Sequence, residues 1–307
     1  MNFSGLLTKM LMLFIFICIG ILCSKTGIID EHGSRVINKI VLYVCGPALM
    51  IYSVLDTRLD YSVGEILLLF VYAIAFNLIA LVFGWLCTKL LCRDGKKRGA
   101  FNLTISFGNI AFMGFPIISA LYGTDAVFLA SVCTMPFNLM LYSAGSLLVT
   151  GGFGKDLPWR KVLLNPSLLG TFVAIILFAF RISLPQVLTD TIGSLANMVI
   201  PLSMILIGSS LGRMEARSIL LTGQYYLVCL CKLILFPLII WGLSKALIAD
   251  EMIVGLLTVL ALMPSAAMSS VLCMEYGGDS DFANGSIFIT TLLSLATVPL
   301  MIYLLLL

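Results

Sequence analysis

Long apolar runs, separated by short polar intervals, are the feature that most constrains this chain. Of its 307 residues, 61% are hydrophobic and only 11% are charged, whereas soluble domains average about 25% charged residues. A helix needs about 20 apolar residues to cross the hydrocarbon core of a bilayer. No polar interval is long enough for a separate soluble domain. The sequence therefore predicts a single all-α polytopic domain embedded in a lipid bilayer.

Ten apolar runs are candidate spans, centred near residues 14, 46, 76, 110, 137, 173, 200, 232, 264 and 293. The first run is interpreted as a retained helix, because further spans follow it. Intervals after runs 1, 3, 5 and 7 hold thirteen Lys and Arg residues, and the alternate intervals hold four. The positive-inside rule therefore predicts that both termini lie on the outer side of the cell membrane.

The second half of the chain repeats features of the first at an offset of 154 residues. This shift places Pro47 on Pro201, and "YGTDAVF" (Tyr122–Phe128) on "YGGDSDF" (Tyr276–Phe282). Because five spans per half is an odd number, the two halves must have opposite orientations, as in secondary transporters. We predict a first inverted repeat at 1–150, a cytoplasmic linker at 151–162 and a second inverted repeat at 163–307.

Two predicted spans, numbers 4 and 9, carry helix-disrupting or polar residues near their centres. These are Gly108, Asn109, Gly114 and Pro116 in span 4, and Pro264, Ser265, Ser269 and Ser270 in span 9. Proline removes an amide donor and glycine tolerates irregular backbone. One such span would indicate a structural kink, but disruption of corresponding spans in both halves favours two broken helices and a binding site between them.

Other polar residues lie near the centres of apolar runs, namely Asn77, Asn138, Thr290 and Thr291. Each could support a site or form an ordinary interhelical hydrogen bond. Lys232 is more informative, because its stem of about 6 Å cannot reach an interface roughly 15 Å away. It either carries a functional charge, as countercharge, titrating group or cation mimic, or bonds carbonyl oxygens structurally.

Several classes of function find no support in the sequence. The charge of +3 is too small to indicate nucleic-acid binding, and the lone His32 has no second histidine to share a metal. The nine cysteines show no metal-type spacing, and no catalytic constellation or phosphate-binding loop is present. We therefore expect no enzyme, no cofactor and no metal.

Several segments resemble the auxin efflux carrier family, whose plant members are the PIN proteins and whose bacterial members include malate and malonate permeases. "GNIAFMGFPIISALYG" from Gly108 is similar to the plant carriers' span 4, and "LMPSAAMSSVLCMEYGGD" from Leu262 to their span 9. The segments "VINKIVLYVCGPAL", "LPQVLTDTIGSLANMVIPLSMILIGSSLG" and "KLILFP" also look like theirs. The plant carriers' long central loop is absent, so a bacterial-type permease is the better match.

The resemblance implies ten helices in two inverted repeats, with spans 4 and 9 crossing where they break. It implies a scaffold of spans 1, 2, 6 and 7, a transport domain of the other six, and a homodimer formed through the scaffold. It also implies that Asn109 contacts the substrate and that Gly114, Pro116 and Pro264 set the crossing.

We expect a secondary transporter, or permease, of small organic anions such as auxin-like monocarboxylates or malate-like dicarboxylates. Its expected substrate-binding residues are Gly108, Asn109, Asn138, Lys232 and Ser265. Residues expected to support them are Pro47, Asn77, Pro201, Ser269, Thr290 and Thr291. A sodium-coupled symporter of the bile-acid type, a channel, and a membrane enzyme or receptor are the alternatives.

Overall fold

The regular secondary structure of the described residues is helical. A computed structural model describes residues 3–55, 61–150, 166–213 and 220–306. Turns and short irregular segments connect the helices, and within these ranges the one strand-like pairing is an antiparallel bridge between Gly108 and Ser265. The predicted linker at 151–162 lies outside the described residues. The all-α class predicted from the sequence is confirmed.

Among the described residues, six helical stretches are long and apolar enough to cross a membrane. These are Glu31–Leu55, Val63–Leu91, Asp125–Val149, Gln186–Arg213, Gly223–Leu247 and Ser280–Leu306. Shorter apolar helices occupy the other four predicted positions, at Leu11–Lys25, Ile110–Tyr122, Leu169–Ala179 and Glu251–Leu262. The chain is thus polytopic, and its division into ten spans stays a prediction.

Contacts divide the chain into two compact units. The first comprises Met1–Phe70, Ala111–Met135 and Arg160–Met214, and the second Val71–Ile110, Pro136–Trp159 and Glu215–Leu307. Two helices, α4 (Val63–Leu91) and α7 (Asp125–Thr150), pass from one unit to the other. The first unit holds predicted spans 1, 2, 6 and 7, and it also takes in the later part of span 4 and the early part of span 5.

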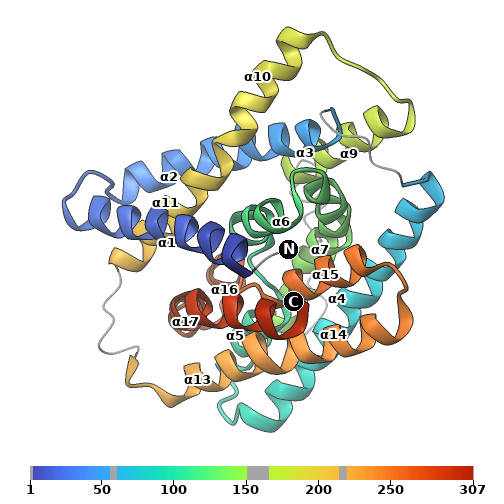
Figure 1. Cartoon of the computed structure of the whole chain (residues 1–307). Helices are drawn as coiled ribbons and strands as arrows, with labels where there is room; N and C mark the ends of the chain where they lie inside the picture. The colour runs from blue at the N-terminus through green and yellow to red at the C-terminus, as the bar shows by residue number, and fades with distance from the viewer. Residues whose placement is uncertain (1–2, 56–60, 151–165, 214–219, 307) are drawn as a thin grey trace. The chain divides into compact units, whose positions relative to one another are not determined.

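The first unit is built around closely packed helices. Its elements are α1 (Phe3–Lys25), α2 (Glu31–Ile40), η1 (Val41–Cys45), α3 (Gly46–Leu55), α6 (Phe115–Tyr122), α9 (Pro166–Ala179), α10 (Gln186–Asn197) and α11 (Val199–Arg213). Helix α1 crosses α11 (Figure 1), with Gly208 against the carbonyl group of Ile17 and Gly20 against that of Ile205. Such close approach is how helices associate in lipid, where burying apolar surface adds little.

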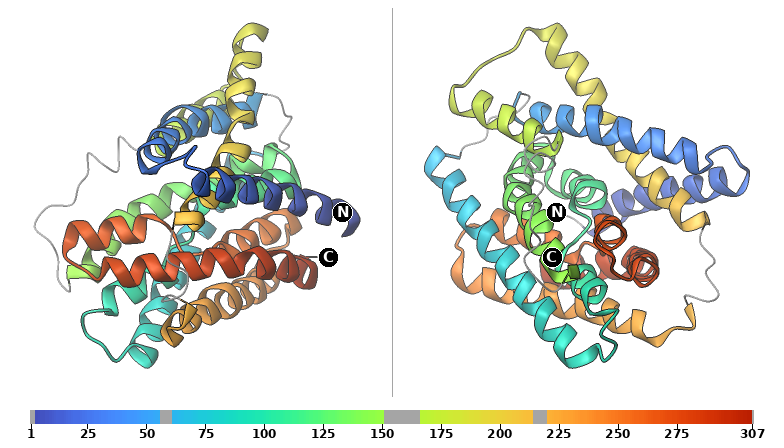
Figure 2. Two further views of the ribbon diagram at one scale, coloured as in Figure 1. Left: turned by 90° about the vertical axis from the view of Figure 1, so that its left-hand side faces the viewer. Right: turned by 180° about the vertical axis from the view of Figure 1, so that it is seen from behind.

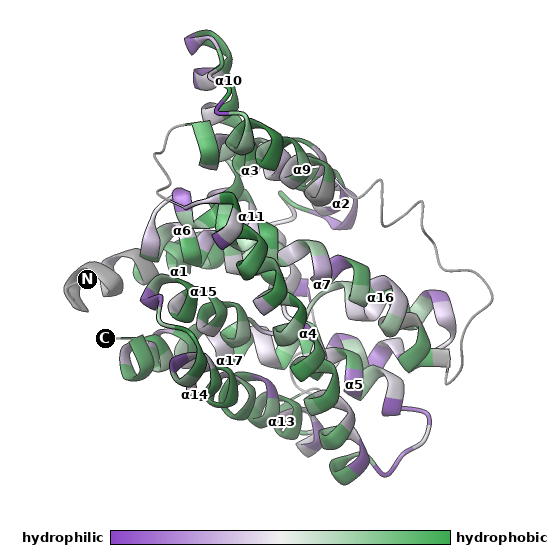
Figure 3. Ribbon diagram, turned by 90° about the vertical axis from the view of Figure 1, so that its right-hand side faces the viewer, coloured by the Kyte–Doolittle hydropathy of each residue, from purple (hydrophilic) through white to green (hydrophobic). Residues whose placement is uncertain are grey.

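The second unit contains the remaining helices. They are α5 (Arg98–Ser106), α13 (Gly223–Cys229), η3 (Leu230–Leu235), α14 (Phe236–Leu247), α15 (Glu251–Leu262), α16 (Met268–Tyr276) and α17 (Ser280–Leu306), with the later parts of α4 and α7. Figure 2 shows α17 beside the continuous helix of α13, η3 and α14, with which it packs. Apolar residues cover most of α4 and α14 (Figure 3), as expected for helices that face lipid.

In the described part of the chain three π-helical turns interrupt the helices, and each ends two residues before a proline. Pro47 follows η1, Pro116 follows η2 (Ile110–Gly114) and Pro237 follows η3. A proline ring in a helix clashes with the carbonyl four residues earlier, and that residue lies in the π turn in every case. Widening the turn moves this carbonyl away and lets the helix continue through the proline.

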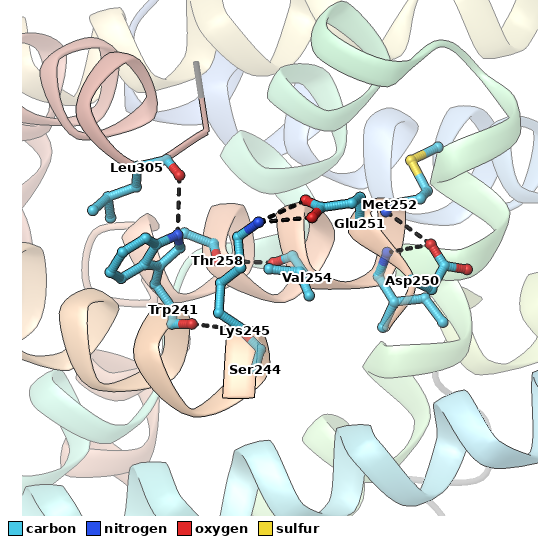
Figure 4. Close-up of polar contacts among 10 residues, drawn as sticks. Trp241, Ser244, Lys245, Asp250, Glu251, Met252, Val254, Thr258 and Leu305 are labelled. Carbon is cyan, nitrogen blue, oxygen red and sulfur yellow. Dashed lines mark hydrogen bonds and ion pairs between the residues drawn. The ribbon is translucent and has the colours of Figure 1, made fainter. Parts of the chain in front are cut away.

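Polar contacts fix the turn between α14 and α15 (Figure 4). The Asp250 carboxylate accepts the amide hydrogen of Met252 at 2.8 Å and so caps α15. Lys245 pairs with Glu251 at 2.7 Å. The Trp241 indole donates to the Leu305 carbonyl at 2.9 Å. Tryptophan and charged pairs are typical of a membrane–water interface.

Candidate functional site: a crossing of two broken helices

Both helices that the sequence predicts to be broken are interrupted, one around Gly108 and the other around Pro264. Helix α5 ends at Ser106, the backbone is extended at Phe107, and η2 begins at Ile110. Helix α15 ends at Leu262, the backbone is extended at Met263, and α16 begins at Met268. Glycine at 108 and proline at 264 explain these positions, because neither residue favours continuation of an α-helix. Gly114 and Pro116, which were also expected to set the crossing, lie in helix, at the end of η2 and the start of α6.

The two breaks lie against each other and pair through their backbones. Asn109 donates its amide hydrogen to the Pro264 carbonyl at 2.7 Å, and Ala266 donates to the Phe107 carbonyl at 2.9 Å. Gly108 and Ser265 form the bridge between these two bonds. An unpaired backbone group in hydrocarbon costs several kcal/mol, so each break supplies the partners that the other needs.

Serine and threonine side chains complete the crossing. The Ser265 hydroxyl donates to the Thr104 carbonyl at 2.7 Å, near the end of α5. The Ser265 amide donates to the Thr290 hydroxyl on α17 at 3.2 Å. The Ser269 hydroxyl donates to the Leu103 carbonyl at 3.4 Å. Three of the predicted site residues therefore hold the break in place.

Lys232 lies beside the crossing and is almost fully buried. Its relative exposure is 1%, and its π turn, η3, packs against α5, α15 and α17. The ammonium nitrogen lies 4.9 Å from the centre of the Phe236 ring, within range of a cation–π interaction. A methyl group at Gly108 would lie 3.3 Å from that nitrogen. Glycine at 108 thus lets the ammonium approach the backbone of the crossing.

The structure brings seven predicted site residues together in the second unit: Gly108, Asn109, Lys232, Pro264, Ser265, Ser269 and Thr290. Asn138 on α7, Thr291 on α17 and Asn77 on α4 are buried in the same unit. The Asn77 side chain donates to the Ala73 carbonyl of its own helix at 2.7 Å. Pro47, Gly114, Pro116 and Pro201 belong to the first unit.

Several contributors to the site were not identified from the sequence, and they include Phe236 and Thr104. Phe236 supplies the ring next to the Lys232 ammonium, and its spacing of four residues on a helix could have indicated this contact. Thr104 contributes through its backbone carbonyl, for which no sequence signal exists. Among the described residues, no group of three or more His, Cys, Asp or Glu side chains could hold a metal ion.

Comparison with known families decides the class of protein. The family described as "Membrane transport protein" matches residues 6–152 and 155–302, nearly the whole chain. The chain belongs to this family. The match confirms, at the level of the family, the resemblance found in the sequence, and the chain is a transporter and not an enzyme.

Relatives in the membrane transport protein family align over almost their full lengths. An uncharacterized transporter of Methanothermobacter thermautotrophicus is 26% identical over 304 residues, covering 98% of both chains. An uncharacterized transporter of Methanocaldococcus jannaschii is 25% identical over 299 residues, covering 94% of this chain and 96% of its own. A Rhizobium meliloti protein named "Putative malonate transporter" is 25% identical over 290 residues, covering 90% of this chain and 89% of its own.

Proposed function

We propose that the protein is a secondary transporter of small organic anions, with the crossing as its substrate site. The observation that carries this proposal is a buried lysine beside two mutually paired helix breaks. Broken helices near the middle of a membrane domain are where secondary transporters bind their substrates. A buried cation favours an anion over a neutral or cationic solute. The relative named for malonate supports a carboxylate.

In this proposal the carboxylate binds at Asn109, which is partly exposed at the crossing. Amides at the start of α16 present the positive end of a helix dipole, which attracts anions. The polar surroundings of the carboxylate are completed by Gly108, Asn138 and Ser265. Lys232, whose ammonium lies near Gly108, adds positive charge. Malonate-like dicarboxylates and auxin-like monocarboxylates both fit such a site.

We further propose two inverted five-helix repeats that exchange substrate by an elevator-type movement. Support comes from the repeated sequence features and from the four shorter apolar helices at the predicted positions. The two stretches that match the family separate at residues 152 and 155, within the predicted linker. In the same proposal both termini lie on the outer side of the membrane, and two copies of the chain form a homodimer through spans 1, 2, 6 and 7.

The direct test is uptake of labelled malonate and labelled indole acetate into proteoliposomes that contain the purified protein. Asn109→Ala should abolish saturable uptake while the protein remains folded by size-exclusion chromatography. Gln186→Ala is the matched control, because it removes an exposed side-chain amide at the start of α10 in the other unit. Uptake by Asn109→Ala equal to that of the wild type would refute the site.

The same proteoliposomes separate the proposal from its competitors. Unlabelled substrate on the opposite side should accelerate uptake, as expected of a carrier and not of a channel. Replacing potassium by sodium, at fixed pH and membrane potential, should leave uptake unchanged. Uptake that requires sodium would favour a symporter of the bile-acid type instead.

A further inference from the structure

Two cysteine side chains from different helices lie against each other in the second unit. The thiols of Cys87 on α4 and Cys231 in η3 are hydrogen-bonded neighbours. All nine cysteines of the chain are free, so both side chains are reduced. The relative exposure is 8% for Cys87 and 1% for Cys231. Two neighbouring thiols can be oxidised to one disulfide, which a single buried thiol cannot form.

Aromatic contacts one helical turn away bring the same faces of the two helices together. The Phe236 ring, at the start of α14, has its centre 5.6 Å from the ring centres of Phe76 and Phe83 on α4, and α4 runs beside α14 (Figure 1). Cys87 follows Phe83 by four residues and so shares its face of α4. The Phe236 amide donates to the Cys231 carbonyl and closes a π turn, which places Cys231 beneath Phe236. Helix packing thus holds the two thiols together.

Cys87 lies near the end of α4 that the charge pattern predicts to be cytoplasmic. It precedes Leu91, the last residue of α4, by four residues, or about 6 Å. Five Lys and Arg residues occupy positions 89–98, as is typical of a cytoplasmic interval. The cytoplasm keeps thiols reduced, and disulfides that form there are usually transient or redox-sensing. The resting state of the pair is therefore the dithiol, and a disulfide would form under oxidation.

The composition of the pair indicates which chemistry it can support. Among the described residues, no third His, Cys, Asp or Glu side chain joins the two thiols in a group that could hold a metal ion. Joining two thiols in a disulfide needs no further ligand. It also buries no charge, because thiols and disulfides are both neutral, and burying an unpaired charge is costly. Oxidation therefore suits this pair better than metal binding.

We propose that Cys87 and Cys231 form a reversible dithiol–disulfide site for a peroxide oxidant, and that the disulfide cross-links α4 to η3. The Cys87 thiolate attacks one oxygen of hydrogen peroxide, so an S–O bond forms as the O–O bond breaks, and the departing hydroxide takes up the thiol proton as water. The Cys231 sulfur then attacks the Cys87 sulfur, and the hydroxyl group leaves with the Cys231 proton as a second water. Two thiols lose two electrons, and one peroxide gains them. Because Cys231 directly precedes Lys232, the cross-link would fix the turn that carries the buried lysine.

The test is peptide mapping of the folded protein in detergent after treatment with hydrogen peroxide and blocking of free thiols with N-ethylmaleimide. Mass spectrometry should find the peptides of Cys87 and Cys231 joined, and dithiothreitol should separate them. Cys92→Ala and Cys229→Ala are the matched controls, because each removes a buried cysteine near one member of the pair, and both should keep the link. Absence of the link, or a link from Cys231 to another cysteine, would overturn the proposal.

Thermal unfolding tests whether the disulfide cross-links the folded helices. Oxidised wild-type protein should unfold about 4–16 °C above the reduced protein, because the link restricts the unfolded chain. Cys87→Ala treated with the same peroxide is the control, since its methionines can be oxidised without forming the link, and it should not be stabilised. Oxidised wild-type protein no more stable than the reduced form would overturn the proposal. Neither experiment measures uptake, so this inference goes beyond the proposed function and does not depend on it.

Discussion

Substitution of Gly208 by alanine should destabilise the first unit. The added methyl group would overlap the carbonyl oxygen of Ile17, and would lie 2.8 Å from the carbonyl carbon of Ile17 and 3.0 Å from Cα of Gly20. Carbon atoms prefer separations of about 3.5–4.0 Å. Since the obstacle is backbone, α1 and α11 must move apart by roughly 1 Å, which weakens every neighbouring contact by about a quarter to a half.

Overpacking of this kind costs about 1–3 kcal/mol. For a domain of roughly 150–250 residues each kcal/mol lowers the melting temperature by about 2–4 °C, so Gly208→Ala should unfold about 2–12 °C below the wild type. The assay is the loss of helical circular dichroism during thermal unfolding in detergent, because the three tryptophans all belong to the second unit. Gly242→Ala is the matched control, because no atom lies within 4 Å of the added methyl group. Equal melting temperatures for both variants would refute the reasoning.

Three further predictions concern the second unit. Ser265→Ala leaves the Thr104 carbonyl without its hydroxyl donor and should lower the free energy of unfolding by about 1–3 kcal/mol. Ser244→Ala removes a hydrogen bond within one helix and should lower it less. Equal losses of stability in thermal unfolding would contradict this prediction. Asp250→Ala removes the cap of α15 and should cost about 0.5–2 kcal/mol in the same assay. Burial raises the pKa of the Cys92 thiol, so a smaller fraction of the thiol is ionised at neutral pH. The rate of maleimide labelling of Cys92, measured by mass spectrometry, should therefore rise from pH 7 to pH 9. Rapid labelling at pH 7 would contradict this prediction.

The breaks at the crossing could be predicted from the sequence because their cause is local. Glycine at 108 and proline at 264 disrupt a helix wherever they occur in it, and apolar length located the helices themselves. The paired occurrence of the breaks also indicated that they belong together. Their backbone pairing at 2.7 and 2.9 Å follows from the need to satisfy polar groups in hydrocarbon.

Other features depend on contacts that no local pattern records. Asn77 was expected to support the site, but its side chain bonds the preceding turn of its own helix, and sequence alone cannot decide between these two uses. The assignment of Ala111–Met135 to the first unit likewise depends on packing between distant segments. Lys232 was recognised as unusual by its depth, yet its approach to Gly108 required the fold.

The π turns before Pro47, Pro116 and Pro237 have a consequence for comparing this chain with its relatives. A π turn accommodates one residue more than an α turn in the same helix. Deleting one residue there would rotate everything beyond it by about 100° about the helix axis. A relative that lacks the proline should therefore show a single-residue gap at the turn. In η3 such a gap would change which neighbours the residue aligned with Lys232 faces, so an alignment that ignores it would match that lysine to the wrong position.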